Sequence, residues 1–422
     1  MKILMVGSGG REHALIRKLK ESPRVTRLLC APGNGGISRD AECFPVAATD
    51  LQGMLELAKQ EKVELVFVAP DDPLALGMVD LFKANGIPAF GPSKAAARIE
   101  ASKVFSKRLM EKYGIPTADY AVYDSAAQAL AYIKQKGAYP VVIKADGLAL
   151  GKGVIIAQSE AEAEEALRSM LEEGKFGESG RRVVVEEFLT GPEVSVLAFT
   201  DGEALVPMVS SMDHKRALDG DKGLNTGGMG TVAPNPCYTP AIADECMEKI
   251  FLPTIKAMQA EGCPFSGCLY FGLMLTPSGP KVIEYNARFG DPETQVVLPL
   301  LDTPLIDVVE AVVNKRLGEL EVKWKDAHAA CVVLASGGYP ESYEKGKPIS
   351  GLDADGQAEG AEIFHAGTAL KDGEFLTSGG RVLGVTAVGD TLAAALESAY
   401  AAAEKISFDG VHYRRDIGAK CK

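Results

Sequence analysis

Residues 282–293, with the sequence VIEYNARFGDPE, combine side chains that could carry chemistry. The stretch begins as an apolar strand and places Glu284 and Asn286 two positions apart, so both side chains share one face. Carboxylate and amide oxygens suit Mg²⁺, whose shell is usually completed by water and substrate phosphates. Arg288 continues the alternation and would hold an anion or a phosphoryl group beside the metal. The stretch predicts a nucleotide-phosphate site, although a strand end with solvated polar residues is the alternative that this segment alone leaves open.

A glycine-rich segment, residues 7–13 with the sequence GSGGREH, follows the first apolar stretch. Backbone N–H groups at the start of a helix bind phosphate, so Gly9, Gly10, Arg11 and Glu12 are candidates for holding an anionic substrate. A dinucleotide fingerprint would need glycine where this chain has Glu12, which argues against a nicotinamide site and favours a phosphorylated sugar. A glycine turn that serves only to pack a helix on a sheet is the alternative.

Two lysines flank a second glycine-rich segment, residues 147–153. Lys144 ends an apolar stretch before it, and Gly151, Lys152 and Gly153 close it. Cations on both sides of a flexible backbone can hold the α- and β-phosphates of a nucleotide while the loop closes as a lid. The segment is not a Walker A loop, because Gly153 stands where Ser or Thr is required. A solvated hairpin is the alternative explanation.

A third candidate segment is an acidic strand end, with the sequence EEFL, followed by a Gly-Pro turn. Its backbone could read the edge of adenine, and a carboxylate could accept hydrogen bonds from both ribose hydroxyls. A solvated acidic strand end is the alternative. The candidate nucleotide-binding residues here are Glu186, Glu187, Phe188, Leu189 and Glu193.

Residues 210–236 show almost no periodicity, and a loop of this length inside a compact region is usually functional or disordered. The segment carries Asp213 and Lys215 in a charged cluster, and a glycine-rich run from Asn225 to Gly230. Clustered cations favour an anion, and glycines let the backbone approach a substrate. A surface charge run is the alternative for the first cluster.

The composition limits the class of protein. The 422 residues suffice for about three domains, and 46% hydrophobic with 24% charged residues is ordinary for a globular protein. A net charge of -12 argues against a nucleic-acid or membrane-surface partner. No apolar run approaches the ~20 residues of a membrane helix, and the first strand is too short for a signal segment. Cysteines without a CxxC pair and histidines without metal-binding spacing make zinc and disulfides unexpected and favour the cytoplasm.

Short apolar stretches alternate with helical ones over the first hundred residues, which indicates a parallel sheet covered by helices. The strands expected there are residues 2–6, 27–30, 65–69 and 88–90. Further along, Ser125 and Ser159 are expected to cap helices. The later strands are expected at residues 140–145, 154–157, 182–187 and 194–199, and a late Ala-rich helix at residues 391–405.

Taken together, the candidate residues stand in the order of an ATP-grasp enzyme, starting with Lys103. The order is far more specific than any single residue. From end to end the chain is similar to one family of that superfamily, the phosphoribosylamine–glycine ligases. The motifs that carry the resemblance are GSGGREHA at 7–14, APGNGG at 31–36, FGPSK at 90–94, KADGLA at 144–149, NTGGMG at 225–230 and NARFGDPE at 286–293.

The resemblance implies an α/β fold with three domains: an N-terminal parallel α/β (pre-ATP-grasp) domain at residues 1–101, an ATP-grasp domain at 102–325 with a mobile lid at about 119–191, and a small α+β C-terminal domain at 326–422. It also implies a reaction of ATP, glycine and 5-phosphoribosylamine, by way of glycyl phosphate. The products would be ADP, phosphate and glycinamide ribonucleotide, in the second step of de novo purine synthesis, with Mg²⁺ or Mn²⁺ as the metal.

The resemblance also assigns roles to residues. Glu284 and Asn286 would hold the metal, Arg288 would hold the carboxylate of glycine and the later oxyanion, and Asp213 and Lys215 would orient glycine or the amine. The residues implied for ATP are Lys103, Lys144, Gly151, Lys152, Gly153, Glu186, Glu187, Phe188, Leu189 and Glu193. Those implied for the ribose phosphate and amine are Gly9, Gly10, Arg11, Glu12, Asn34, Asp72, Asn225 and Gly228.

Two departures from the family pattern are visible. Family members usually carry Glu where this chain has Asp71, followed by Asp72, which changes the reach of a carboxylate toward the sugar phosphate. The further upstream metal carboxylate common in the superfamily has no counterpart in residues 271–274.

Several alternatives accompany this expectation. One is another carboxylate–amine ligase, or a carboxylase acting on a phosphoribosyl intermediate. Others are a Rossmann oxidoreductase and a nucleotide-binding regulator without turnover. We expect a monomer, because each domain is long enough to bury its own apolar faces.

Overall fold

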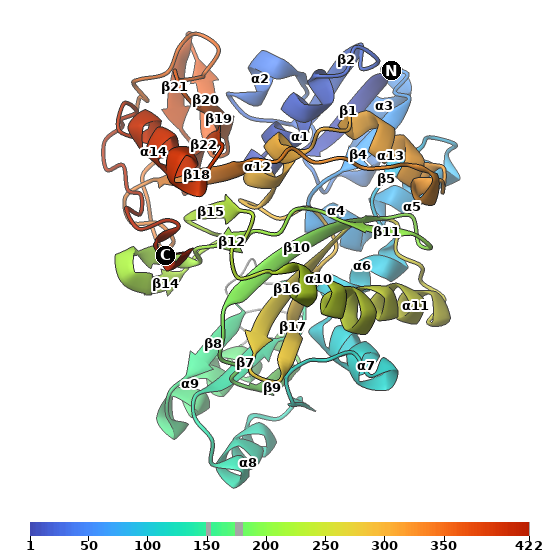
Figure 1. Cartoon of the computed structure of the whole chain (residues 1–422), viewed down its shortest axis with the longest axis vertical. Coiled ribbons are helices and arrows are strands. Elements are labelled where there is room, and N and C mark those ends of the chain that lie inside the picture. The colour runs from blue at the N-terminus through green and yellow to red at the C-terminus, as the bar shows by residue number, and fades with distance from the viewer. Residues whose placement is uncertain (149–152, 174–179, 422) are drawn as a thin grey trace.

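The computed structural model describes residues 1–148, 153–173 and 180–421. These residues form four sheets of four or five strands and two two-stranded sheets, and Figure 1 shows one four-stranded sheet, with its two helices, projecting at the bottom of the molecule away from the other three large sheets. No helix of these described residues is long and apolar enough to cross a membrane.

The N-terminal region is a parallel sheet of five strands in the order β3-β2-β1-β4-β5. The buried runs of β1 and β4 explain this arrangement, since strands covered on both faces are apolar throughout. The predicted strands are confirmed. The strands are β1 (Lys2–Gly7), β2 (Arg27–Pro32), β3 (Glu42–Cys43), β4 (Leu65–Val68) and β5 (Ala89–Phe90), and the helices are α1 (Gly10–Lys20), α2 (Ile37–Asp40), α3 (Leu51–Gln60), α4 (Asp71–Leu76), α5 (Met78–Ala84) and α6 (Lys94–Ala101).

The lid is an antiparallel sheet in the order β6-β9-β7-β8, covered by two helices. Ser125 and Ser159 cap those helices by accepting from the backbone N–H three residues on, as the sequence predicts. The lid consists of β6 (Tyr120–Tyr123), α8 (Ala126–Lys136), β7 (Val141–Ala145), β8 (Val154–Ala157), α9 (Glu160–Leu171) and β9 (Val183–Glu187).

The central sheet of the ATP-grasp region is antiparallel in the order β11-β10-β16-β17. Helix α7 (Lys103–Tyr113) leads from the N-terminal region toward the lid, and helices α10 (Pro240–Cys246) and α11 (Leu252–Ala260) pack beside the sheet (Figure 1). The strands are β10 (Glu193–Thr200), β11 (Leu205–Pro207), β16 (Gly267–Thr276) and β17 (Gly279–Asn286).

The C-terminal sheet has the order β12-β15-β18-β22-β19 and is covered by α14 (Leu392–Ala403). Two of its strands, β12 (Met212–Asp213) and β15 (Gly230–Ala233), come from residues 210–236, where we expected a long loop. That expectation was wrong, because tertiary pairing of β15 with β18 (His328–Ala335) makes strands of a segment without periodicity. The remaining elements are β13 (Arg216–Leu218), β14 (Lys222–Asn225), α12 (Thr294–Val297), α13 (Leu305–Val313), β19 (Glu362–His365), β20 (Thr368–Lys371), β21 (Glu374–Thr377) and β22 (Arg381–Gly389).

The apolar cores show which parts are joined. One buried cluster combines N-terminal residues such as Leu4 with Phe271 of β16, and a second combines Ile3 with Phe199 of β10 and Phe364 of β19. The lid has a separate cluster, which includes Ile143 and Leu167. The N-terminal, central and C-terminal sheets are therefore packed into one body, and the lid keeps a core of its own. The bounds of the three domains stay a prediction.

Candidate active site

Strand β17 presents the two residues expected to bind a metal. Glu284 and Asn286 lie on one half-buried face, while Tyr285 between them is buried on the other and shares a hydrogen bond of 2.9 Å with Thr254. The alternation predicted from the sequence is therefore present. Gly272 pairs with Glu284 across the sheet, and a Cβ there would come within 3.0 Å of the Glu284 Cγ. Glycine at position 272 therefore leaves room for the Glu284 side chain.

The Glu284 carboxylate lies among cations. The Nζ of Lys215 is 3.5 Å from Glu284 Oε1 and 3.3 Å from Glu193 Oε2. Lys215 lowers the pKa of Glu284 against the effect of burial, and Lys144 and Lys103 lower it further. Glu193 in turn raises the pKa of Lys215 well above its usual value. Both partners are held in their charged forms.

Lys144 ends β7 and reaches across to the central sheet. Its Nζ lies 3.0 Å from Glu186 Oε1 and donates a 3.0 Å hydrogen bond to the carbonyl of Ile283. The other oxygen of Glu186 is 3.0 Å from the Nζ of Lys107, and all three charged side chains are buried. The Glu186 carboxylate, one of the candidate nucleotide-binding groups, is thus engaged with two lysines.

The strand end after Glu186 remains open. Glu187 is exposed, and its carboxylate pairs with Lys281 of β17 at 3.0 Å. Phe188 is 39% exposed and Leu189 is partly buried. The backbone of this strand end is consequently accessible to a planar ligand beside the central sheet.

The glycine loop is described in part. Lys103 donates a 2.8 Å hydrogen bond to the carbonyl of Gly147, which attaches the start of α7 to the loop. Burial lowers the pKa of Lys103, while Glu284 raises it. Gly153 is buried directly before β8. Gly151 and Lys152, expected to contact ATP, lie outside the described residues.

Glu284 and Asn286 could supply the protein ligands of a magnesium site. Within the described residues no group of three or more His, Cys, Asp or Glu side chains could hold a metal, so this pair cannot enclose an ion alone. The side chain of Asn286 has no hydrogen-bond partner within that same part of the chain, which leaves its oxygen free beside an ionised carboxylate. Mg²⁺ bound through one or two protein oxygens takes the rest from phosphates and water.

Arg288 lies just beyond the end of β17. Its guanidinium is 3.1 Å from Glu100 Oε1 and donates to the carbonyl of Phe289 at 3.2 Å. Burial disfavours the charge, but Glu100 and Asp71 outweigh it and raise the pKa of Arg288. Its Nε is buried without a hydrogen-bond partner in the described chain. A buried guanidinium with a free N–H is suited to an anionic group.

The start of α1 is held by its own side chains. Glu12 accepts a hydrogen bond of 2.5 Å from the Gly9 N–H and lies 2.6 Å from the Nε of Arg11. Arg11 also donates to the carbonyl of Phe289 at 3.2 Å, and Gly10 is the first residue of the helix. Glu12 therefore caps the helix and orients Arg11, which brings the predicted anion-binding loop beside the strand end that carries Arg288.

Asn34 and Asp72 differ in what surrounds them. The Asn34 amide donates 2.8 Å hydrogen bonds to the carbonyls of Ser8 and of His365, so it fastens the loop after β2 to the first loop and to the C-terminal sheet. Asp72 is exposed, whereas Asp71 is half-buried and its charge acts on Arg288. Asp71, which the sequence analysis treated as a departure from the family pattern and not as a site residue, is thus the one of the two whose charge acts on Arg288.

Asp213 and Gly228 lie close together in the segment that supplies β12 and β15 to the C-terminal sheet. Burial and the nearby Glu293 raise the pKa of Asp213 well above its usual value, and its Oδ1 accepts from the His214 N–H at 2.7 Å. Gly228 has a φ of 115°, and a Cβ there would lie 2.6 Å from Asp213 Oδ1. Asn225 is exposed at the end of β14, apart from this pair.

Sequence reasoning missed several charged residues of the site. Lys107, Glu100 and Arg381 were not predicted, and Arg381 of β22 donates hydrogen bonds to the carbonyls of Gly227 (2.7 Å) and Asp291 (2.8 Å). These two contacts join residues 154 and 90 positions apart, so only a fold could reveal them. In the sequence, the NARFGDPE motif, which contains Asp291, was the one available indication of these contacts.

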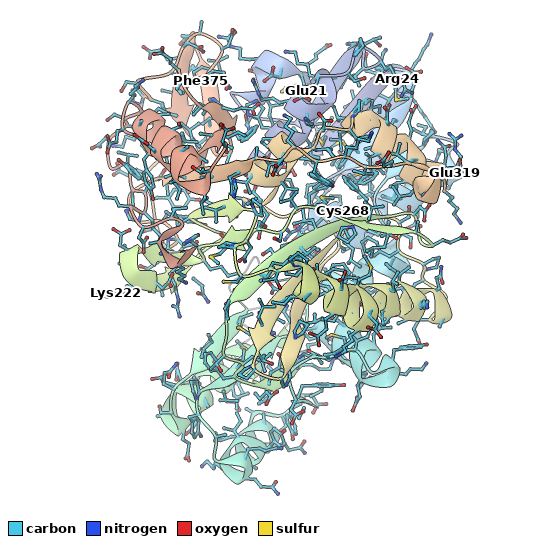
Figure 2. All side chains as sticks on the ribbon, viewed as in Figure 1. Glu21, Arg24, Lys222, Cys268, Glu319 and Phe375 are labelled. Carbon is cyan, nitrogen blue, oxygen red and sulfur yellow. The ribbon has the colours of Figure 1, made fainter. Side chains whose placement is uncertain are left out.

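Of the seven cysteines whose surroundings the structure describes, five are buried, and Cys43 and Cys237 are half-buried. Figure 2 shows Cys268 in the interior, where the central sheet meets the N-terminal region. Burial raises the pKa of its thiol well above the usual range, and that of Cys331 to about 12. The described cysteines are free. A thiol whose pKa is raised in this way stays protonated and is a poor nucleophile.

Comparison with known proteins now identifies the arrangement. Family models described as the N domain, the ATP-grasp (A) domain and the C domain of phosphoribosylglycinamide synthetase match residues 1–100, 101–294 and 329–420. The phosphoribosylamine–glycine ligase of Caldanaerobacter subterraneus subsp. tengcongensis is 49% identical over 99% of this chain and 100% of its own. This chain belongs to the phosphoribosylamine–glycine ligase family.

Solved structures agree with this assignment. The phosphoribosylamine–glycine ligase of Thermotoga maritima has a TM-score of 0.85 and 37% identity, covering 99% of this chain and 100% of its own. The biotin carboxylase domain of Hydrogenobacter thermophilus 2-oxoglutarate carboxylase, solved with MgADP, has a TM-score of 0.73 at 17% identity and covers 98% and 91%. That neighbour shares only the fold. The predicted family, fold class and ligase function are confirmed, and the oxidoreductase alternative is excluded.

Proposed function

We propose that this chain joins glycine to 5-phosphoribosylamine with cleavage of ATP to ADP and phosphate, and that the residues around Glu284 carry out the reaction. One observation carries the assignment of residues. Lys103, Lys144, Lys215 and Arg288 all act on the Glu284 carboxylate, although they come from α7, the lid, the C-terminal edge and the strand end. Cations that converge from separate elements can neutralise the negative charges of a polyphosphate, and the carboxylate among them can bind its metal.

The first step would form glycyl phosphate. The glycine carboxylate attacks the γ-phosphorus of ATP, and the bond to the β,γ-bridging oxygen breaks to release ADP. Lys103 and Lys144 hold the phosphates, and the backbone of Glu187 to Leu189 reads adenine. Mg²⁺ or Mn²⁺, held by Glu284 and Asn286 together with phosphate oxygens, would offset the charge that develops on the transferring group.

The second step would form the amide bond. The nitrogen of 5-phosphoribosylamine attacks the acyl carbon, the carbon–oxygen bond to phosphate breaks, and the nitrogen loses a proton. Arg288 holds the carboxylate oxygen that becomes the oxyanion, and its free N–H fits this role. Asp213 and Lys215 orient glycine and the amine. The start of α1, with Arg11, and the half-buried Asp71 would hold the ribose phosphate and its hydroxyls.

Closure of the lid would keep water from glycyl phosphate. The contact from Lys144 to Ile283 joins lid and central sheet where the phosphates would lie, so lid position and phosphate binding depend on the same lysine. We also propose that the chain works in the cytoplasm as a monomer.

The first test is ADP release from Mg-ATP with glycine and 5-phosphoribosylamine omitted in turn. Release that requires both substrates is expected. Release without glycine would favour a carboxylase or another ATP-grasp ligase, and the absence of release with all substrates would favour a nucleotide-binding regulator.

The metal assignment is tested with Glu284→Gln, which keeps the shape and removes the charge. We expect a loss of turnover of about 100-fold at saturating Mg²⁺, with Tm within about 3 °C of wild type. Glu245→Gln is a matched control, because Glu245 of α10 is partly exposed and pairs with the exposed Lys249 one turn further on. Wild-type turnover by Glu284→Gln would refute the assignment.

A further inference from the structure

Lys107 is a buried cation that the reaction described above does not use. It lies on the second turn of α7 with 2% of its surface exposed. Its Nζ is 3.0 Å from Glu186 Oε2 and donates a 2.8 Å hydrogen bond to the Thr117 hydroxyl. An ammonium group is buried only when its partners compensate the lost water.

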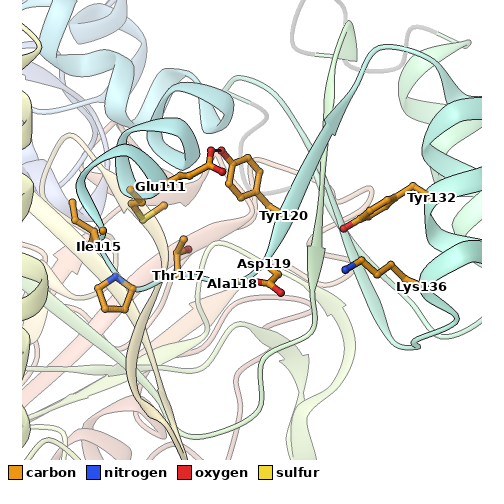
Figure 3. Close-up of a pocket in the computed structure, with 11 residues that line it drawn as sticks. Glu111, Ile115, Thr117, Ala118, Asp119, Tyr120, Tyr132 and Lys136 are labelled. Carbon is orange, nitrogen blue, oxygen red and sulfur yellow. Dashed lines mark hydrogen bonds between the residues drawn. The ribbon is translucent and has the colours of Figure 1, made fainter.

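The first neighbour is the segment through which the chain enters the lid. Figure 3 shows residues 115–119 running from α7 to β6, with the Tyr120 hydroxyl bonded to Glu111 at 2.7 Å. The Thr117 hydroxyl donates to the carbonyl of Val282 in β17 at 2.7 Å, so this one side chain links Lys107 to the central sheet. A pocket lined by Tyr120, Tyr132 and Lys136 opens beside the segment (Figure 3). The lid is thus attached at this point mainly by polar contacts.

The second neighbour is Glu186, which lies between two lysines. Lys107 lies 3.0 Å from the Oε2 of this carboxylate, and Lys144 donates to the same oxygen at 3.1 Å and lies 3.0 Å from Oε1. Three buried groups with two positive charges and one negative charge leave a net charge of +1. Burial and Lys144 lower the pKa of Lys107 to about 8, while Glu186 raises it. Without Lys107, the carboxylate would neutralise Lys144 alone.

We infer that Lys107 is a positioning residue for the nucleotide: by sharing Glu186 it leaves the charge of Lys144 available to phosphate, and by bonding Thr117 it ties that pair to the base of the lid. This inference rests on the proposed role of Lys144 in ATP binding. Lys107 itself need not touch the nucleotide. Its effect is electrostatic and passes through one carboxylate.

The test measures binding of Mg-ADP to the full-length protein by titration calorimetry, which needs neither glycine nor the amine. For Lys107→Met we expect binding about ten-fold weaker than wild type, and a KM for ATP raised to match while the KM for glycine stays within about two-fold. Lys112→Met is the matched control, since Lys112 lies on the same helix and is 63% exposed, and it should bind as wild type does. Lys107→Arg keeps the charge and should restore most of the affinity.

A second substitution separates the electrostatic role from simple support of the fold. Glu186→Gln added to Lys107→Met removes the carboxylate that would neutralise Lys144, and Mg-ADP affinity should return to within about three-fold of wild type. Should Lys107→Met melt too low for assay, this double variant decides alone. A double variant as weak as Lys107→Met, or ten-fold weaker than wild type, would overturn the inference.

The outcomes for the two proposals are distinct. Wild-type protein that does not bind Mg-ADP would refute the proposed function. Wild-type binding with an unchanged affinity in Lys107→Met would leave the proposed function intact and refute the role of Lys107.

Discussion

The lid and the rest of the molecule are stabilised in different ways. The lid has a small apolar core of its own, whereas the N-terminal, central and C-terminal sheets share buried clusters. Phe289 illustrates the sharing, because its ring lies 6.0 Å from Phe67, 6.3 Å from Phe90 and 5.9 Å from Phe199. No ring contact of this kind joins lid to body within the described residues.

The contacts between lid and body are mostly polar. Lys144 bonds the Ile283 carbonyl, Glu187 pairs with Lys281, and Asp146 accepts from the Ser102 hydroxyl at 3.0 Å. Polar contacts can exchange with water when they open, while a shared apolar core cannot open without exposing its surface. Separate cores joined by polar contacts predict that the lid can move as a unit against the body.

The largest effect is expected from breaking the shared core. Phe289→Ala removes a buried ring that contacts two sheets and should lower the free energy of unfolding by about 3–5 kcal/mol. Denaturant unfolding followed by circular dichroism measures the loss. A loss below about 1 kcal/mol would contradict the single-body view of the N-terminal and central sheets.

A matched change in the lid should act locally. Leu167→Ala opens the lid core, in which Leu167 is 1% exposed, and should cost about 2–4 kcal/mol in lid stability alone. Hydrogen exchange should become faster in β7 and β9, while the main unfolding transition of the body changes little. An equal drop in the main transition would show that lid and body unfold together.

Acid should weaken the body and spare the lid. His365 lies between the N-terminal and C-terminal sheets, its backbone N–H donates to His13 Nδ1 at 2.8 Å, and burial and His13 lower the pKa of its ring to about 3. The unfolded chain takes up a proton below about pH 6.5 and the folded one does not, so stability falls as pH drops from 6.5 toward 3. The slope is up to about 1.4 kcal/mol per pH unit for such a group.

The lid segment, residues 119–191, contains no histidine. Its hydrogen exchange, corrected for intrinsic rates, should stay constant from pH 7 to 5 while that of β19 rises. His365→Gln should reduce the pH slope of body stability, and an unchanged slope would remove His365 from the explanation.

The smallest expected effect compares two helix caps. Ser159 caps α9 of the lid, and Thr391 caps α14 of the body. Each change to Ala should cost about 1 kcal/mol. Ser159→Ala should appear only in lid exchange and Thr391→Ala in the main melting transition, and the reverse distribution would be inconsistent with separate cores.

Much of the fold and part of the site could be predicted from local pattern. The parallel strands, the caps at Ser125 and Ser159, and the shared face of Glu284 and Asn286 depend on neighbours a few residues away, and all are present. Alternation and capping are local physics, so one sequence suffices for them.

The rest depends on partners far along the chain. The two-residue strand Met212–Asp213 is a strand only because β15 lies beside it. Lys107 meets Glu186 across 79 positions, and no local spacing signals such a pair. Asp71 and Asp72 are adjacent and alike in type, and only the path of α4 decides which one lies nearer to Arg288.

The pairing of β15 with β18 also limits how this protein could be recombined with its relatives. Residues 212–233 supply one side of the C-terminal sheet, so a fragment starting at residue 326 would expose the edge of β18 and invite aggregation. A graft of the C-terminal region from another ligase would need that earlier segment as well. Exchange between relatives should succeed when both pieces are transferred together. The two stretches therefore form a single unit for recombination, although they lie far apart along the chain.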